Sequence, residues 1–328
     1  MSVVVTGCAG FIGAAVCAGL LDAGERVVGI DEMNDAYDPS LKEWRLRCLQ
    51  RKEGFAFHEV DIAEKEALFR VLDGARQEED VSAVINLAAR AGVRQSIENP
   101  EIYFRTNVTG CLHLLRWVCA NGVEKFVQAS SSSVYGDLEE QPFREDASTD
   151  RPLSHYAASK KASELLCHSF HHLYGTDMAV LRFFTVYGPA GRPDMSIFRF
   201  IRWIAEGEDV IVYGDGEQSR DFTFVQDIAD GVIKSMQVKG FETINLGGDS
   251  PVKINEIIAM LEGLLGRECT IRRKEANPLD VRATWADISK AREMLGWEPV
   301  THIEEGLRRT VDWYLENREW ASKICLGD

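Results

Sequence analysis

The stretch VVVTGCAGFIGAAV, residues 3–16, decides the fold of this chain. Val3 to Thr6 form a short apolar, β-branched run, which predicts a buried strand. Gly7, Gly10 and Gly13 follow at intervals of three, and a helical pattern continues after them. Such glycines allow a tight turn, close approach of the backbone to a pyrophosphate and close packing of the helix on the sheet. The order of strand, turn and helix predicts a dinucleotide site, with Phe11 and Ile12 at the start of the helix.

The residue that ends the second strand predicts which dinucleotide this site prefers. Asp31 ends the run Arg26 to Asp31. An acidic side chain in that place would bond the adenosine ribose diol and repel a 2′-phosphate, which favours NAD over NADP. The alternative is that Asp31 only caps a turn. The ends of the third and fourth strands add the remaining expected cofactor contacts, Asp61, Ile62, Leu87, Ala88 and Ala89.

Short apolar runs alternate with helix-length segments through the first half of the chain. Continuous apolar strands in this arrangement indicate a parallel sheet covered by helices on both faces. We therefore predict an α/β fold with a Rossmann-type, doubly wound parallel sheet. The expected strands are Val3–Thr6, Arg26–Asp31, Phe55–Val60, Val81–Leu87, Lys125–Ser130 and Met178–Phe183.

The regular alternation of strands and helices ends at about Gly188, and beyond it a smaller, interleaved mixed α/β lobe is expected. The segments Phe222–Lys239 and Ile244–Gly247 should return to the first sheet. We expect residues 1–187 with about 221–248 to form the NAD-binding domain, and residues 188–220 and 249–328 to form the substrate lobe. The lobe's expected helices are Ser196–Glu206, Ile254–Leu265, Ser289–Leu295 and Ile303–Glu319, and its expected strands are Val210–Tyr213 and Cys269–Arg272.

Composition narrows the class of protein. The chain has 328 residues and a net charge of −15, which disfavours nucleic acid or an anionic membrane as a partner. The apolar N-terminus has no basic region and is broken by glycines. We therefore expect it to be part of the folded protein and not a signal peptide. Eight cysteines without a Cys-x-x-Cys pair indicate reduced thiols in a cytoplasmic protein. Three clustered histidines, His168, His171 and His172, lack further ligands, and no metal site is expected.

A candidate catalytic pair lies in SHYAASKKAS, residues 154–163. Tyr156 and Lys160 are four residues apart, on one face of an expected helix. A neighbouring ammonium favours ionisation of a phenol, whose pKa is otherwise about 10. This spacing predicts a tyrosinate base, although the same pattern is common on solvated helix faces.

Several motifs together resemble the extended short-chain dehydrogenase/reductase superfamily, the NAD-dependent epimerases and dehydratases of nucleotide sugars. They cover nearly the whole chain: TGxxGxxG at 6–13, NLAA at 86–89, the serine run with VYG at 130–136, YxxxK at 156–160 and RDF at 220–222. Within this superfamily the chain is most similar to the UDP-glucuronate 4-epimerases, through the segments 87–100, 129–136 and above all RFFTVYGPAGRPDMSIFRF at 182–200.

The resemblance implies a catalytic role for three residues and a tightly held NAD. Tyr156 would take the proton of the sugar 4-hydroxyl with help from Ser131, and Lys160 would support the phenolate and bind the nicotinamide ribose. Ser132 and Ser133 stand where related dehydratases carry an Asp-Glu pair and decarboxylases a glutamate. Serine cannot protonate a leaving hydroxyl at neutral pH, so dehydration is disfavoured.

The resemblance also implies a UDP-sugar substrate whose 4-keto intermediate must be protected from loss of carbon dioxide. We expect Ser132, Thr185 and Arg192 to hold the substrate carboxylate, although Arg192 also fits a pyrophosphate. Arg220 and Arg282 are the expected pyrophosphate ligands, and Tyr213 is expected near the uracil. The alternatives are salt bridges for the arginines and a core position for Tyr213.

The leading hypothesis is NAD-dependent 4-epimerisation of UDP-glucuronate to UDP-galacturonate. The alternatives are a UDP-glucose or UDP-N-acetylhexosamine 4-epimerase, a UDP-glucuronate decarboxylase, and a dinucleotide-binding sensor without chemistry. The resemblance implies a homodimer formed by the helices near Ile102–Cys119 and Tyr156–Tyr174, whose apolar stripes could equally face the sheet.

Overall fold

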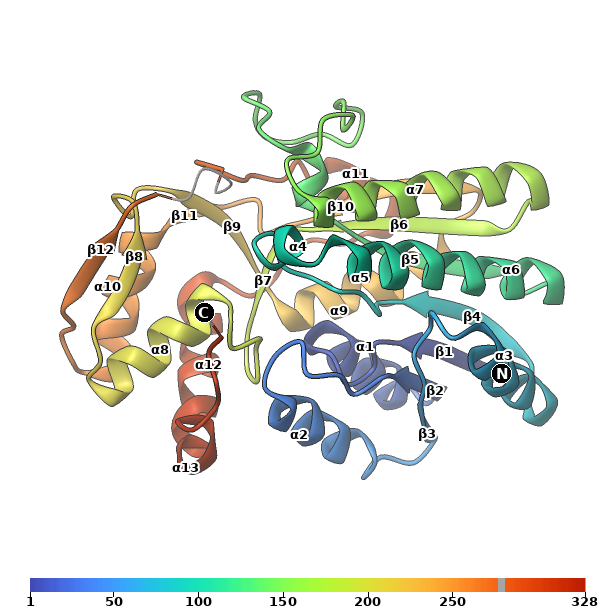
Figure 1. The fold of residues 1–328 in the computed structure, drawn as a ribbon, viewed down its shortest axis with the longest axis horizontal. Coiled ribbons are helices and arrows are strands. Elements are labelled where there is room, and N and C mark those ends of the chain that lie inside the picture. Colours follow the sequence, from blue (N-terminus) through green and yellow to red (C-terminus); the bar gives the residue numbers. More distant parts are fainter. Residues whose placement is uncertain (277–280, 328) are drawn as a thin grey trace.

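A parallel sheet of seven strands forms the centre of the computed structural model, which describes residues 1–276 and 281–327 (Figure 1). The strand order β10-β6-β5-β4-β1-β2-β3 confirms the predicted doubly wound α/β fold. Each of the six strands expected first lies within one residue of its predicted bounds at either end. The strands are β1 (Ser2–Thr6), β2 (Arg26–Asp31), β3 (Phe55–Glu59), β4 (Val81–Asn86), β5 (Lys125–Ser131), β6 (Asp177–Phe183) and β10 (Phe241–Leu246).

Two apolar cores cover the two faces of this sheet. Because successive side chains of a strand point to opposite faces, Val3 and Val5 pack in one core and Val4 packs in the other. Helices α1 (Phe11–Asp22) and α9 (Val225–Lys234) cover the first face. Helices α3 (Lys65–Glu78), α6 (Cys111–Asn121) and α7 (His155–Tyr174) cover the second. The continuous apolar strands of the sequence are therefore buried on both sides.

The C-terminal lobe has its own core around two small sheets. One sheet has the order β11-β9-β7 and the other pairs β12 with β8. The strands are β7 (Thr185–Tyr187), β8 (Val210–Tyr213), β9 (Ser219–Phe224), β11 (Pro251–Lys253) and β12 (Ile271–Lys274). Its helices are α8 (Ser196–Glu206), α10 (Ile254–Leu265), α12 (Ile303–Glu316) and α13 (Arg318–Ala321). Helix α11 (Ser289–Leu295), also predicted for this lobe, instead packs against β10 and α9, with Ala291 buried in the core of the large sheet.

Three further expectations for this half need correction. Strand β12 begins at Ile271, two residues later than predicted. The predicted helix Ile303–Glu319 ends at Glu316, because Asn317 leaves the helical conformation (φ −107°, ψ 10°) before α13 begins. Strand β9 pairs with β7 and β11, whereas the following helix α9 and strand β10 return to the large sheet as expected.

Helix α2 (Pro39–Leu49) joins the two halves of the molecule. Its Leu41 is buried in the C-terminal core. The ring of Trp44 lies 5.6 Å from that of Trp313 on α12 and 6.4 Å from that of Trp320 on α13. A helix of the first half thus packs against the end of the chain, as Figure 1 shows.

The remaining helices lie beside α7 on one side of the molecule (Figure 1). They are α4 (Gln95–Glu98) and α5 (Pro100–Phe104), and a π-helical turn at Arg105–Gly110 connects α5 to α6. The expected helix near Ile102–Cys119 is therefore interrupted by a change of helical pitch. Among the described residues, no helix is both long and apolar enough to cross a membrane.

Candidate functional site

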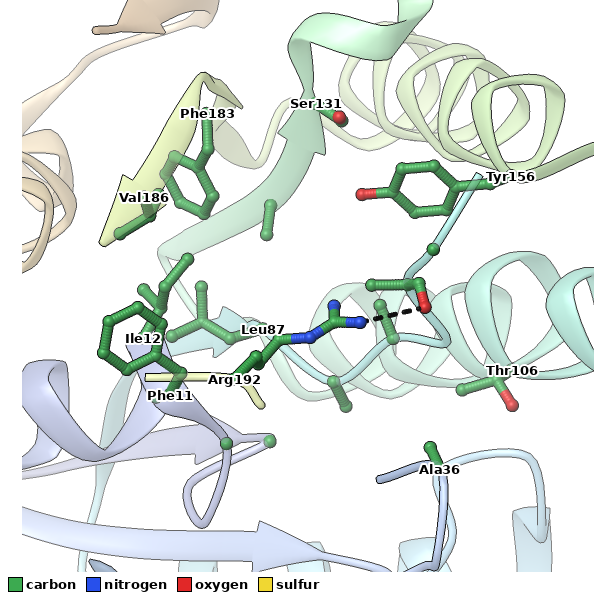
Figure 2. Close-up of a pocket in the computed structure, with 18 of the residues that line it drawn as sticks. Phe11, Ile12, Ala36, Leu87, Thr106, Ser131, Tyr156, Phe183, Val186 and Arg192 are labelled. Carbon is green, nitrogen blue, oxygen red and sulfur yellow. Dashed lines mark hydrogen bonds between the residues drawn. The ribbon is translucent and has the colours of Figure 1, made fainter. Parts of the chain in front are cut away.

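A large cavity opens at the carboxyl ends of the parallel strands and continues toward the C-terminal lobe. In doubly wound sheets this is where ligands bind. Most residues predicted for the site line it: Gly7, Gly10, Phe11, Ile12, Gly13, Asp31, Asp61, Ile62, Leu87, Ala88, Ala89, Ser131, Ser132, Tyr156, Lys160, Thr185 and Arg192. Figure 2 shows Phe11, Ile12 and Leu87 at one end and Tyr156 with Ser131 at the other.

The glycine-rich turn is built so tightly that side chains have no room. Gly7 has a φ of +71°, and a Cβ atom on it would lie 2.7 Å from the backbone nitrogen of Ala88. A Cβ atom on Gly13 would lie 2.0 Å from the carbonyl oxygen of Gly7. Helix α1 has Gly10 as its N-cap, with no side-chain cap and no acidic residue in the first turn. Its free N–H groups and dipole therefore suit the phosphates of a dinucleotide.

Asp31 has the position expected for a ribose ligand and also caps a turn. Its carboxylate accepts hydrogen bonds from the backbone N–H groups of Ala9 at 3.1 Å and Met33 at 2.9 Å. The buried Nζ atom of Lys42 lies 3.5 Å away. The two interpretations of Asp31 are thus compatible, because a carboxylate can accept several hydrogen bonds at once.

Two further polar groups lie along the cavity. Asp61 accepts from the N–H of Ala63 at 2.8 Å and pairs with Arg105 at 2.8 Å, which fixes the turn after β3. The hydroxyl of Thr106 is buried without a hydrogen-bond partner, and Thr106 lines the cavity (Figure 2). Because buried hydroxyls are normally paired, this group fits a site that receives a polar ligand.

Tyr156 and Lys160 lie on the first turns of α7. Ser154 caps the helix by accepting from the N–H of Ala157 at 3.1 Å. Spacing of four residues places both side chains toward the cavity. The Nζ atom of Lys160, however, donates to the carbonyl oxygen of Ala129 on β5 at 2.9 Å.

The electrostatics of this pair differ from the prediction. Burial raises the pKa of Tyr156, and the neighbouring Ser131 hydroxyl and the charge of Arg192 counteract that rise. Burial lowers the pKa of Lys160 to about 8, and the charge of the nearby Glu164 carboxylate counteracts this effect. The groups that favour the tyrosinate are therefore Ser131 and Arg192, whereas Lys160 is engaged with β5.

Ser131 stands at the end of β5, where the strand turns into a short 3₁₀ segment, Ser132–Tyr135. Its hydroxyl accepts from the N–H of Ser133 at 3.2 Å, which holds it at the cavity wall. Beneath it, Ser130 donates to Glu164 at 2.6 Å, and Glu164 forms a two-pronged ion pair with Arg182 at 2.9 Å. This buried network fixes the end of β5 against α7.

Arg192 reaches into the same cavity from the loop after β7, so that its guanidinium lies on the side facing the Tyr156 ring (Figure 2). It pairs with Asp194, with 3.0 Å between Nε and Oδ1 and 2.6 Å between Nη2 and Oδ2. Nη2 also donates to the carbonyl oxygen of Ala91 at 3.4 Å. A cation therefore lies in the part of the cavity that is lined by Tyr156, the predicted catalytic tyrosine.

Three predicted substrate residues lie away from this cavity wall. Tyr213 on β8 is half-buried, with the guanidinium carbon of Arg94 4.4 Å from its ring centre. Arg220 donates to the carbonyl oxygen of Ser219 at 2.8 Å. Ser219 also donates its N–H to the carbonyl oxygen of Arg282 at 3.1 Å. The structure thus brings Arg220 and the exposed Arg282 onto neighbouring segments of the C-terminal lobe.

Arg45 is a site residue that the sequence analysis missed. It is 3% exposed and donates to the carbonyl oxygens of Ala9 at 3.1 Å and Ala190 at 2.6 Å, and to the hydroxyl of Tyr37 at 2.7 Å. It therefore ties the glycine-rich turn to the loop that carries Arg192. In the sequence, the segment PSLKEWRLR resembles an exposed charged helix, so no pattern signals this burial.

Sequence comparison places the chain among known proteins. The family model described as GDP-mannose 4,6 dehydratase matches residues 4–310. The chain belongs to the NAD-dependent epimerase/dehydratase family of extended short-chain dehydrogenases/reductases. A UDP-glucuronate 4-epimerase from Thermodesulfobacterium geofontis is 52% identical over 98% of both chains.

Solved structures of family members share the fold. The Bacillus cereus UDP-glucuronic acid 4-epimerase, in complex with UDP-glucuronic acid and NAD, has a TM-score of 0.90 and 34% identity, covering 97% of this chain and all of its own. The UDP-glucose 4-epimerase of Thermotoga maritima, with UDP-glucose, has a TM-score of 0.88 and 30% identity over the same shares. Because one fold carries several reactions, the substrate must be argued from the site.

Proposed function

We propose that this family member is an NAD-dependent isomerase that interconverts UDP-glucuronate and UDP-galacturonate at C4. The observation that carries the proposal is the position of Arg192. This cation enters the sugar end of the cavity facing Tyr156, in a chain whose net charge is −15. A uronate brings a carboxylate to that place, whereas a neutral hexose does not. The relatives named above, at 52% and 34% identity, act on the same sugar nucleotide.

The cavity fits NAD at its other end. The turn at Gly7, Gly10 and Gly13 would hold the pyrophosphate, Asp31 the adenosine ribose, and Lys160 with Tyr156 the nicotinamide ribose. Asp61, Ile62 and residues 87–89 would flank the rest of the molecule. When bound, NAD supplies a hydride acceptor for the first half of the reaction and a hydride donor for the second.

The chain's own residues carry the proton and the orientation of the sugar. Tyr156 accepts the proton of the 4-hydroxyl as the 4-ketone forms, and returns it when the ketone is reduced from the other face. Ser131 shares the hydrogen bond to that oxygen. Ser131 and Arg192 already lower the pKa of Tyr156 against the effect of burial. A base that titrates nearer to neutral pH transfers protons more effectively in both directions.

A uronate requires that the site control the C6 carboxylate. A 4-ketone beside this group is a β-keto acid, which loses carbon dioxide when the C5–C6 bond aligns with the carbonyl π system. We assign Arg192, Ser132 and Thr185 to hold the carboxylate out of that alignment, because all three line the same cavity as Tyr156. Arg220 and Arg282 are assigned to the diphosphate of the substrate, and Tyr213 to the side of its uracil.

Dehydration and decarboxylation are less well supported. The two positions after Ser131 hold Ser132 and Ser133, which line the cavity without an ionisable side chain. Asp194 also lines it, but its carboxylate is held in the ion pair with Arg192. An acid for a departing hydroxyl is thus missing from these positions.

We further propose a cytoplasmic homodimer. Large apolar side chains are exposed on the neighbouring helices α4, α5 and α7, namely Ile97, Phe104, Leu165, Leu173 and Tyr174. A surface of this kind fits an interface between two copies. Leu165→Glu combined with Phe104→Glu should give a monomer by light scattering, and an unchanged mass would contradict this interface. The eight cysteines are free thiols, which suits a reducing compartment.

The deciding experiment is incubation of the purified protein with UDP-glucuronate, with and without added NAD, followed by proton NMR. UDP-galacturonate without a UDP-pentose supports the proposal. A UDP-pentose would indicate decarboxylation instead. An unchanged spectrum with UDP-glucuronate, together with turnover of UDP-glucose or UDP-N-acetylglucosamine, would favour the neutral-sugar epimerases.

A further inference from the structure

Arg192, the cation proposed to bind the substrate carboxylate, already forms an ion pair with Asp194 inside the cavity. Both side chains line the cavity, with exposures of 21% and 14%. Two parallel N–H to oxygen contacts join them, which is the strongest arrangement for this kind of pair. Asp194 thus occupies the edge of the guanidinium formed by Nε and Nη2. The cation that would receive a substrate carboxylate is already paired with a protein carboxylate.

A reaction that inverts C4 needs the sugar to move. Hydrogen leaves one face of C4 and returns to the other, so the 4-keto sugar must turn within the cavity between the two half-reactions. A carboxylate bound through two hydrogen bonds to an unpaired arginine would hold the sugar in one orientation. A carboxylate that shares the arginine with Asp194 is offered fewer N–H groups and is repelled by the second negative charge.

We propose that Asp194 is a positioning residue that keeps the grip of Arg192 on the substrate carboxylate weak enough for the sugar to turn. This inference rests on the proposed function, because it concerns how that same site treats a uronate. Asp194 fixes the direction of Arg192 and limits its charge toward the substrate. The site thus binds the uronate less tightly, and the 4-keto intermediate can reorient between the two half-reactions.

The chain offers a matched control for this pair. Arg144 and Asp146 have the same spacing of two residues, and Nε of Arg144 lies 3.2 Å from Oδ1 of Asp146. Both side chains are exposed, at 63% and 74%, and neither lines the cavity. Asp146→Asn therefore removes a similar local ion pair without touching the site.

The test compares Asp194→Asn, Asp194→Glu and Asp146→Asn. Dissociation constants for UDP-glucuronate and UDP-glucose are measured by calorimetry with Tyr156→Phe added to stop turnover, and kcat is measured by NMR with Tyr156 intact. In Asp194→Asn we expect the dissociation constant for UDP-glucuronate to fall about tenfold, the effect of one charge-assisted hydrogen bond. The constant for UDP-glucose should stay unchanged, and kcat for UDP-glucuronate should fall. Asp194→Glu, which keeps the charge, and Asp146→Asn should behave like the parent.

The outcomes separate the inference from the function on which it rests. Unchanged or weaker binding of UDP-glucuronate by Asp194→Asn would overturn the inference, as would an equal change for both sugar nucleotides, which marks a structural role. If the wild-type protein forms no UDP-galacturonate, the proposed function fails and takes this inference with it. If the wild type epimerises and the affinity of Asp194→Asn does not increase, the inference alone fails.

Discussion

The Nζ atom of Lys160 donates a hydrogen bond to the carbonyl oxygen of Ala129 at 2.9 Å, across the boundary between α7 and β5. This contact directs the ammonium toward the carboxyl end of β5, where Ser130 and Ser131 follow Ala129. Burial lowers the pKa of Lys160 to about 8. A lysine is cationic below its pKa, so this residue loses its charge within the range where the enzyme can be assayed.

The pH dependence of the reaction should report this loss. As pH rises through about 8, Lys160 loses the charge with which it would bind the nicotinamide ribose in the proposed function. The ratio kcat/KM should therefore fall on the alkaline side with a midpoint near 8. The ratio kcat/KM reports the titration of groups in the free enzyme. Lys160→Met should lower the rate and lack this limb. Lys239→Met, at an 80% exposed site, should keep it; a limb that persists in Lys160→Met would assign it to another group.

Replacing Tyr156 with Phe should lower kcat by about 10³-fold, within the usual contribution of a proton-transfer group. The ring remains, so the packing against Tyr103, whose ring centre lies 6.2 Å away, should be preserved. The measurement is the rate of UDP-galacturonate formation together with the NAD content of the purified protein. Tyr103→Phe is the control and should stay within about tenfold of wild type. Comparable losses in both variants would contradict a specific role for the Tyr156 hydroxyl.

Arg192→Ala should increase the share of turnovers that end in carbon dioxide. Without this cation the C6 carboxylate of the 4-keto intermediate is free to align with the carbonyl group. The measurement is the ratio of UDP-pentose to UDP-galacturonate by NMR. Arg199→Ala, on α8 and outside the cavity lining, is the comparison. A ratio equal to that of wild type would remove Arg192 from the protection of the intermediate.

Arg45→Met should weaken both the fold and cofactor retention. The variant leaves the carbonyl oxygens of Ala9 and Ala190 without their buried donor, and such losses destabilise a protein by about 1–3 kcal/mol each. We expect a lower midpoint of urea unfolding and less NAD released on denaturation. Arg47→Met, an exposed partner of Glu43 on the same helix, should change neither quantity. Full NAD content in Arg45→Met would show that the glycine-rich turn holds its shape without this clamp.

Asp221 should make the free energy of unfolding decrease as pH rises from about 4 to about 6. Its carboxylate is buried and accepts from the N–H groups of Gly248 at 2.6 Å and Ala286 at 2.8 Å. Burial still raises its pKa from 3.8 to about 6. Between these values the folded state binds more protons than the unfolded state, so this residue's contribution to stability falls as pH rises. The change amounts to about 3 kcal/mol.

The test is urea unfolding of wild type and Asp221→Asn between pH 4 and 7. The difference between their free energies of unfolding should shift by that amount in favour of Asp221→Asn as pH rises, and should level off above about pH 6. Asp230→Asn, at an exposed position on α9, corrects for general effects of charge. A difference that does not vary with pH would contradict the raised pKa.

The sequence by itself determined the doubly wound sheet and the pocket wall that follows its strands. Apolar runs such as Val3 to Thr6 are local, and an invariant rule places the carboxyl ends of parallel strands along one edge. Residues that end a strand, such as Asp31 and Ser131, were therefore predictable as neighbours. The glycine spacing acts through backbone geometry within a few residues. The structure confirms the tight turn, because Gly7 has a φ of +71°.

Only the tertiary structure decided which charged side chains meet. Arg45 resembles a surface residue until α2 packs against the C-terminal helices. This packing buries it between the glycine-rich turn and the loop at Ala190, which lies 145 residues from Arg45 in the chain. Lys160 is spaced for Tyr156, but the position of β5 gives it the carbonyl group of Ala129 instead. Side-chain electrostatics depend on burial and on partners from distant segments. A local sequence pattern cannot contain that information, because folding alone brings those segments together.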